Sequence, residues 1–158
     1  MKRLLTFRGF LPFPALLLLL AGCASVPDAP ASVQQRASSF KPPPGRAFVY
    51  VFRPFALERL TVTTELSLDQ RNFGTLSPKT FLCAAVKPGS HELKTLSFFG
   101  DTAQRFQAEA GGLYFFQAKP KPDGWVLEPV SEAEGRERVA KYRLSGDNAF
   151  EAGERQPR

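Results

Sequence analysis

The chain has 158 residues, 43% of them hydrophobic, and a formal net charge of +6. One histidine and two cysteines are too few for a protein zinc site, which takes three or four clustered ligands, so we expect no metal and no other cofactor. The charge gives no reason to expect a nucleic acid partner, because half of the excess lies in the first eight residues.

Residues 1–22 are predicted to be an export signal. Lys2, Arg3 and Arg8 make its start basic, and an apolar stretch follows at 10–20. That stretch is shorter than the roughly 18 to 20 apolar residues that a membrane span needs. We therefore expect the segment to be removed rather than to cross the bilayer.

The signal ends on Leu20-Ala21-Gly22-Cys23, which resembles the lipobox of bacterial lipoproteins at all four positions. The resemblance implies that the Cys23 thiol takes a diacylglyceryl group and that cleavage and acylation of the new amine follow. Two or more acyl chains hold a protein stably, since each buried methylene contributes about 0.8 kcal/mol. Ala24 in the next position implies sorting to the periplasmic face of the outer membrane, with the inner membrane as the alternative. An ordinary secretory leader with an incidental cysteine is the other alternative.

Loss of this leader changes the charge of the protein. It takes away three basic residues and no acidic ones, so 18 basic and 15 acidic residues remain and the charge falls to +3. Contact with anionic lipid stays open at that charge. Once Cys23 is lipidated, Cys83 is the only thiol left, and we expect no intramolecular disulfide.

The mature chain divides into three parts by composition. Residues 23–45 contain the lipidated cysteine and a proline-rich tether, which would span about 25 Å as a coil or about 65 Å as extended polyproline. Residues 46–144 have the length and apolar content of one domain. Residues 145–158 are polar and glycine-containing, and are predicted to be a disordered tail.

The domain is predicted to be mainly β. Runs rich in β-branched and aromatic residues cover 46–53, 61–69, 73–76, 80–86, 90–99, 104–109, 113–119 and 125–130. A Pro-Gly centre at 88–89 predicts a type II turn that pairs the runs before and after it as a hairpin. Only 131–144 has a helical pattern, with Ser131 and Glu134 as a capping box. The sequence therefore favours a small antiparallel β-sandwich of about seven strands with one C-terminal helix.

A thiol nucleophile, Cys83 with His91 as its base, is the sharpest enzymatic hypothesis. The predicted hairpin pairs Val86 with His91 and Cys83 with Lys94, which separates thiol and imidazole by about 10 Å. Proton transfer needs about 3 Å. We therefore expect Cys83 to be a small core residue beside Phe81.

Glu65 and Asp69 form a possible carboxylate pair, but both lie on the polar face of one strand, where solvated carboxylates are usual.

The end of the first predicted strand offers the main binding candidates. Arg53 could anchor an acidic partner, or it could cover a sheet edge. Phe55, Leu57 and Leu60 follow in a loop, and would form a docking patch if they are exposed.

Four segments resemble, in this order, an uncharacterised family of bacterial lipoprotein domains of unknown function. They are Phe48-Val-Tyr-Val-Phe-Arg-Pro54, the turn at Asp69 with 73–76, Val86-Lys-Pro-Gly-Ser-His91, and Gly112-Leu-Tyr-Phe-Phe116. The Pro-Gly-x-His segment also resembles small β-sandwich repeats of the PEGA type. The resemblance implies an architecture and a location, and it supplies no catalytic residues.

Together these observations predict a non-enzymatic interaction module, held to the membrane by a lipid anchor, that binds another envelope protein. The alternative is a carrier of a small hydrophobic ligand or lipid in a β-rich pocket. An enzyme is the least expected class, because no catalytic group of residues emerges from the sequence.

Overall fold

The computed structural model describes residues 26–57, 62–97 and 100–146. The predicted leader, Cys23 and Leu60 lie outside these residues, as does most of the predicted tail.

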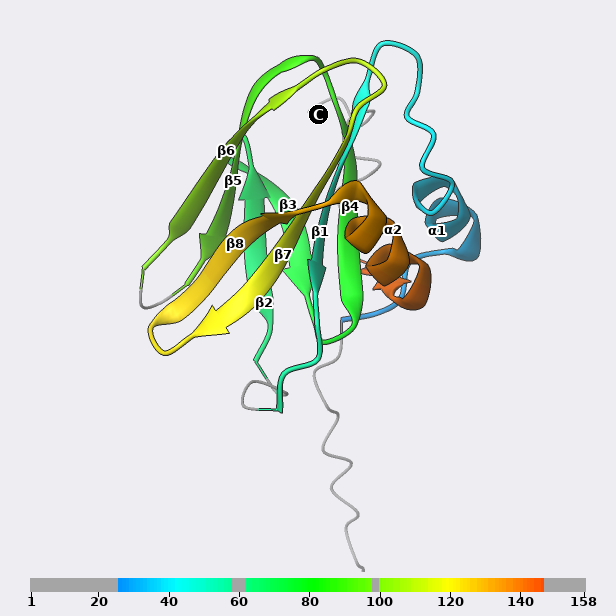
Figure 1. The fold of residues 1–158 in the computed structure, drawn as a ribbon. Coiled ribbons are helices and arrows are strands. Elements are labelled where there is room, and N and C mark those ends of the chain that lie inside the picture. The colour runs from blue at the N-terminus through cyan, green and yellow to red at the C-terminus, as the bar shows by residue number, and fades with distance from the viewer. Residues whose placement is uncertain (1–25, 58–61, 98–99, 147–158) are drawn as a thin grey trace, which may run out of the picture.

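Two β-sheets pack face to face (Figure 1). The five-stranded sheet has the order β8 (Gly124–Val130), β7 (Leu113–Lys121), β1 (Ala47–Arg53), β4 (Thr80–Val86) and β9 (Arg143–Leu144). The four-stranded sheet has the order β3 (Arg71–Leu76), β2 (Thr64–Leu68), β5 (Gly89–Leu96) and β6 (Thr102–Ala108). The mainly β prediction is confirmed, with nine strands among the described residues. Most strand pairs are antiparallel, while β1 pairs in parallel with β7 and β4 with β9.

The strand β1 is the centre of the larger sheet, and all seven of its residues are buried. Phe48 and Tyr50 point to one face and Val49 and Val51 to the other, because side chains alternate along a strand. A strand with apolar residues on both faces needs cover on both sides, and the molecule accordingly has two cores.

The inner core fills the space between the sheets. Its buried residues are Ala47, Val49, Val51, Leu66, Phe73, Leu76, Leu82, Ala84, Val86, Leu93, Ala108, Phe116, Ala118, Trp125 and Leu127. The outer core lies on the opposite face of the five-stranded sheet, under two helices. Its buried residues are Val33, Ala37, Phe48, Tyr50, Phe52, Phe81, Cys83, Phe115, Val139, Tyr142 and Leu144.

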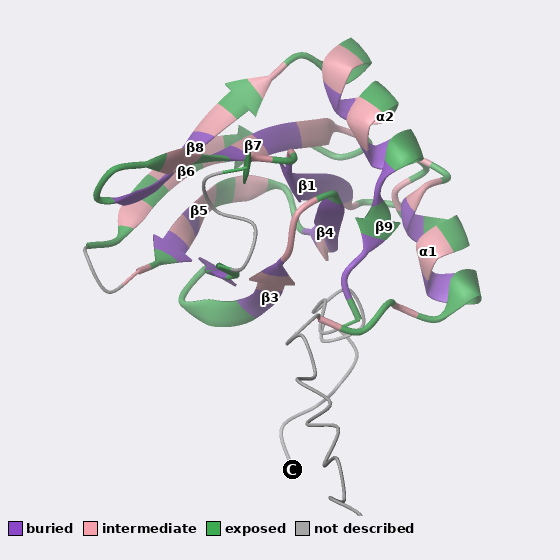
Figure 2. Ribbon diagram, turned by 90° about the horizontal axis from the view of Figure 1, so that it is seen from below, coloured by how far each residue is buried: buried purple, intermediate pink, exposed green. Residues whose placement is uncertain are grey.

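The two helices are α1 (Ala31–Ala37) and α2 (Glu132–Lys141). Figure 2 shows that both turn exposed residues to solvent, while β1 and β4 beneath them are buried. The predicted cap is confirmed, since the Ser131 hydroxyl accepts a hydrogen bond from the Glu134 amide at 3.3 Å. The helix ends at Lys141, before the predicted end at 144, because residues 143–144 pair with β4 as β9.

The segment that the sequence predicts to be a tether is in large part folded. The helix α1 buries Val33 and Ala37 in the outer core, and the Tyr50 hydroxyl donates a hydrogen bond to the Ala37 carbonyl at 2.7 Å. Ahead of this helix, the Gly146 amide donates to the Pro27 carbonyl at 2.6 Å. The tether prediction is therefore wrong from about residue 27 onward.

The predicted hairpin around Pro88 is also wrong. Val86 pairs with Ala47 in one sheet, and Gly89 pairs with Ala108 in the other. The chain crosses between the sheets here, at a glycine with a φ of 137°. Proline and glycine suit a sharp change of chain direction, both in a tight turn and in a crossing between sheets. The local sequence therefore does not distinguish the two.

Candidate functional site

The thiol and the imidazole of the sequence hypothesis lie in different layers. Cys83 is fully buried in the outer core, on the helix-covered face of the five-stranded sheet. His91 belongs to β5 in the other sheet. Burial raises the pKa of the Cys83 thiol well above its usual value, which disfavours the nucleophilic thiolate. The structure therefore does not assemble a Cys83–His91 dyad, and the prediction that Cys83 is a core residue is confirmed.

His91 takes part in a hydrogen-bond network at one end of the sandwich. Its Nδ1 lies 2.7 Å from the Asp69 carboxylate, and its Nε2 lies 2.7 Å from the Lys87 carbonyl. The other Asp69 oxygen accepts from the Glu92 amide at 3.0 Å, and Arg105 donates to the Glu92 carboxylate at 2.9 Å. Both ring nitrogens are thus engaged within the domain.

This network holds the turn between β2 and β3 in place. Asp69 and Gln70 have φ values of 51° and 63°, a left-handed pair that is typical of tight hairpin turns. The Asp69 amide donates to the Glu92 carbonyl at 2.9 Å, so side chain and backbone both fasten the turn to β5.

The carboxylate pair of the sequence analysis is too widely spaced. Glu65 lies four residues before Asp69, and roughly 3.3 Å per residue places the two Cα atoms about 13 Å apart. The two carboxylates therefore do not form the pair that glycoside hydrolysis needs.

Arg53 is turned into the molecule rather than toward a partner or over an edge. It is fully buried, and its guanidinium donates to the carbonyls of Val62 and Leu76. The guanidinium carbon lies 4.4 Å from the centre of the Trp125 ring, within the range of cation–π contacts. Arg53 thus fastens the end of β1 to the neighbouring sheet, and this role does not leave its charge available for an acidic partner.

The residues after Arg53 do present apolar surface. Phe55 is 53% exposed and Leu57 is 72% exposed. Val62, on the far side of the same loop, is 39% exposed, and the Lys79 ammonium lies 5.7 Å from the centre of the Phe55 ring. Two of the three apolar docking candidates are therefore solvent-accessible, and Leu60 lies outside the described residues.

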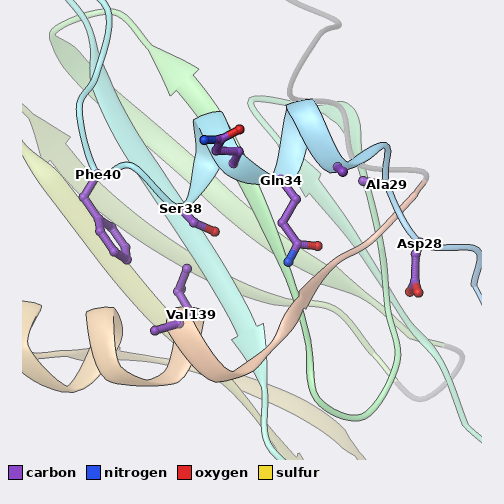
Figure 3. Close-up of a pocket in the computed structure, with 9 residues that line it drawn as sticks. Asp28, Ala29, Gln34, Ser38, Phe40 and Val139 are labelled. Atoms are coloured by element: carbon purple, nitrogen blue, oxygen red, sulfur yellow. The ribbon is translucent and has the colours of Figure 1, made fainter.

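A groove lies between α1 and α2, over the outer core (Figure 3). Its volume is about 570 Å³, and it is lined by Asp28, Ala29, Ala31, Gln34, Gln35, Ser38, Phe40, Val139 and Ala140. Phe40 closes one end, with the Arg136 guanidinium 4.6 Å from its ring centre. Sequence reasoning missed this groove because one of its walls was assigned to the tether.

Two further observations concern metal binding and membrane crossing. Among residues 26–57, 62–97 and 100–146, no three histidine, cysteine, aspartate or glutamate side chains are placed to hold a metal ion. Within the same ranges, neither helix has the length and apolar character that crossing a bilayer requires.

Comparison with known proteins relates the chain to a protein family and to a bacterial protein. A family described as "Protein of unknown function (DUF2846)" matches residues 43–126, from just before β1 into β8. An uncharacterized protein from Haemophilus influenzae is 29% identical over 133 residues, which cover 81% of this chain and 79% of that protein. The expected membership of an unknown-function family is thereby confirmed, while the likeness to PEGA repeats and the lipoprotein leader stay predictions.

Proposed function

We propose that this chain, which belongs to the DUF2846 family of proteins of unknown function, is a lipid-anchored, non-enzymatic binding module of the bacterial cell envelope. In this proposal Cys23 carries the lipid and the sandwich lies on the periplasmic side of the outer membrane. The domain binds another envelope protein and catalyses no reaction.

One observation carries the proposal: Leu20-Ala21-Gly22-Cys23 stands immediately ahead of a folded domain. Among the described residues, the first backbone contact of that domain is at Pro27, four residues after the cysteine. A basic start, an apolar stretch and this motif are what export and lipidation of the domain that follows would need.

The state of the reactive side chains supports the non-enzymatic part of the proposal. Cys83 is buried and keeps its proton, and His91 is bonded through both ring nitrogens. The carrier alternative has less support, because large side chains fill the space between the sheets. A hydrophobic molecule retained by the natively purified protein in mass spectrometry would favour the carrier.

Metabolic labelling tests the anchor. Cells that express the full chain are fed an alkyne-bearing fatty acid, and the protein is compared with its Cys23→Ser and Cys83→Ala variants. We expect label and membrane fractionation in the wild type and in Cys83→Ala, and neither in Cys23→Ser. The Cys83 variant is a matched control because it also removes one thiol. Label that persists in Cys23→Ser would overturn the proposal.

Crosslinking of the lipidated chain in its own cells tests the binding role. We expect a discrete envelope protein to be crosslinked to wild type and to be lost when Cys23→Ser releases the domain from the membrane. A lipidated, folded chain without any crosslinked protein would contradict the interaction module.

A further inference from the structure

We infer that the end of the sandwich around Lys79 lies against the lipid bilayer, with Phe55, Leu57, Val62 and Leu96 in contact with the membrane surface. We call these four residues the apolar end. The inference rests on the proposed function, because it takes Cys23 as the lipidated residue.

The short distance in sequence between Cys23 and the fold is the first argument. Pro27 is fixed to Gly146 by a hydrogen bond of 2.6 Å, and the Ala29 amide donates to the Leu144 carbonyl at 3.1 Å. Four residues of fully extended chain span at most about 14 Å. A domain attached this closely cannot stand 25 Å or more from the bilayer, so one of its surfaces must face the lipid.

Lys79 connects the start of the described chain to the apolar end. Asp28 and Arg143 form an ion pair at 2.7 Å, and the Arg143 amide donates to the Lys79 carbonyl at 3.2 Å. The Lys79 amide in turn donates to the Arg53 carbonyl at 2.9 Å, and its ammonium lies over the Phe55 ring. The first folded residues and the loop after β1 therefore share one end of the sandwich, the lower end in Figure 1.

The distribution of exposed apolar residues is the second argument. Among the described residues, Phe55, Leu57, Val62 and Leu96 are the large hydrophobic side chains that are exposed. The first three belong to the loop between β1 and β2. Leu96 is paired with Glu65 at the start of β2, so it lies at the same end. Apolar surface concentrated at one end indicates a contact made there.

Charged residues at this end are mixed in sign. Lys79, Lys121 and Arg143 are exposed, and so are Asp28 and Asp101. Attraction to anionic headgroups therefore largely cancels. The contact that this surface fits is apolar insertion at the interface of any fluid bilayer, and it should not depend on anionic lipid.

Fluorescence quenching by lipid tests the inference. The lipidated full chain is reconstituted in phosphatidylcholine vesicles that contain a nitroxide-labelled lipid, and a dye is attached to Leu57→Cys, Leu96→Cys or Ala110→Cys. Cys83 is fully buried and does not compete for the dye. Ala110 is the matched control, because it is exposed and lies at the other end of the sandwich. Its neighbour Gly111 donates an amide hydrogen bond to the carbonyl of Arg46, just before the start of β1, whereas Phe55 and Leu57 follow the end of β1.

We expect quenching at positions 57 and 96 to be several-fold stronger than at 110, and unchanged when phosphatidylglycerol is added. Mass spectrometry of the same samples reports the acyl group on Cys23. A lipidated protein with equal quenching at all three positions overturns the inference and leaves the proposed function standing. A protein without an acyl group overturns the proposed function, and the inference with it.

Discussion

Two buried polar side chains, Tyr50 and Cys83, define the centre of the outer core. The Tyr50 ring stacks on Phe115 with centroids 4.7 Å apart, and its hydroxyl is bonded to Ala37. Burial raises the pKa of Tyr50 and of Cys83, since ionisation at either site would place a charge in an apolar layer. Both groups therefore stay protonated while the domain is folded.

This burial predicts a loss of stability at alkaline pH. The unfolded side chains lose their protons near pH 9.0 for Cys83 and pH 10.0 for Tyr50, whereas the folded ones keep them. The free energy of unfolding should therefore be unaffected by these groups below about pH 9 and fall above it, with a limiting slope of about 1.4 kcal/mol per pH unit for each group. Urea unfolding between pH 7 and pH 10.5 measures this.

The double variant Tyr50→Phe, Cys83→Ala is the control for this alkaline effect. It lacks both ionisable groups, so its stability should fall less steeply above pH 9 than that of wild type. Equal slopes in the two proteins would contradict the assignment.

At the scale of elements, the packing of α2 depends on a residue without a side chain. Gly135 is buried against β7, and a Cβ added there would lie 2.1 Å from Cγ of Phe115. Three i,i+4 ion pairs line the helix, so its exposed face is adapted to solvent. The close approach of helix and sheet therefore fixes this position as glycine.

Replacing Gly135 by alanine should therefore destabilise the domain. Alanine at an open helical position stabilises by about 1 kcal/mol relative to glycine. Here the added methyl group would displace Phe115, and we expect Gly135→Ala to lower the free energy of unfolding by about 1 to 3 kcal/mol. Chemical denaturation measures the sign, and a more stable variant would show that α2 does not pack this closely.

The sequence predicts elements best where burial repeats along the chain. β1 reads as a central strand because both of its faces are apolar, and α2 is marked by its cap at Ser131. The helix α1 escapes prediction because only Val33 and Ala37 of its seven residues are buried. The two-residue β9 is too short for any periodicity, and the crossing at Gly89 uses the same residues as a hairpin.

At the scale of the whole molecule, the larger sheet needs cover from segments distant in sequence. Its outer face is covered by α1 from the start of the domain and by α2 from its end, and β9 forms its edge beside β4. The family match at 43–126 contains neither helix. The residues that match the family and the residues that form the folded domain therefore differ in extent.

A chain trimmed to residues 43–126 should consequently fail to form a stable domain, whereas 26–146 should fold cooperatively. The trimmed chain would expose Phe48, Tyr50 and Phe52 to water, which removes the burial that stabilises β1. Thermal unfolding and binding of a hydrophobic dye compare the two. A cooperative transition in the shorter chain would show that the helices are dispensable.

The candidate sites were predicted less completely than the fold. Burial of Cys83 follows from a single apolar strand, whereas the sequence left open whether Phe55 and Leu57 are exposed. The contacts of Arg53 with Val62, Leu76 and Trp125 join three separate elements, and the groove between the helices depends on α1. Contacts between distant segments leave no local pattern, so the sequence could not reveal them.

The hydrogen bond between Gly146 and Pro27 also has a mechanical consequence. The chain enters and leaves the domain at one point, where Asp28 and Ser145 form a single bridge. Tension applied between residues 26 and 146 would first load the contacts between residues 27–29 and 144–146. If the chain is anchored by lipid as proposed, a partner that pulled on the segment after residue 146 would pull against that anchor through these same contacts.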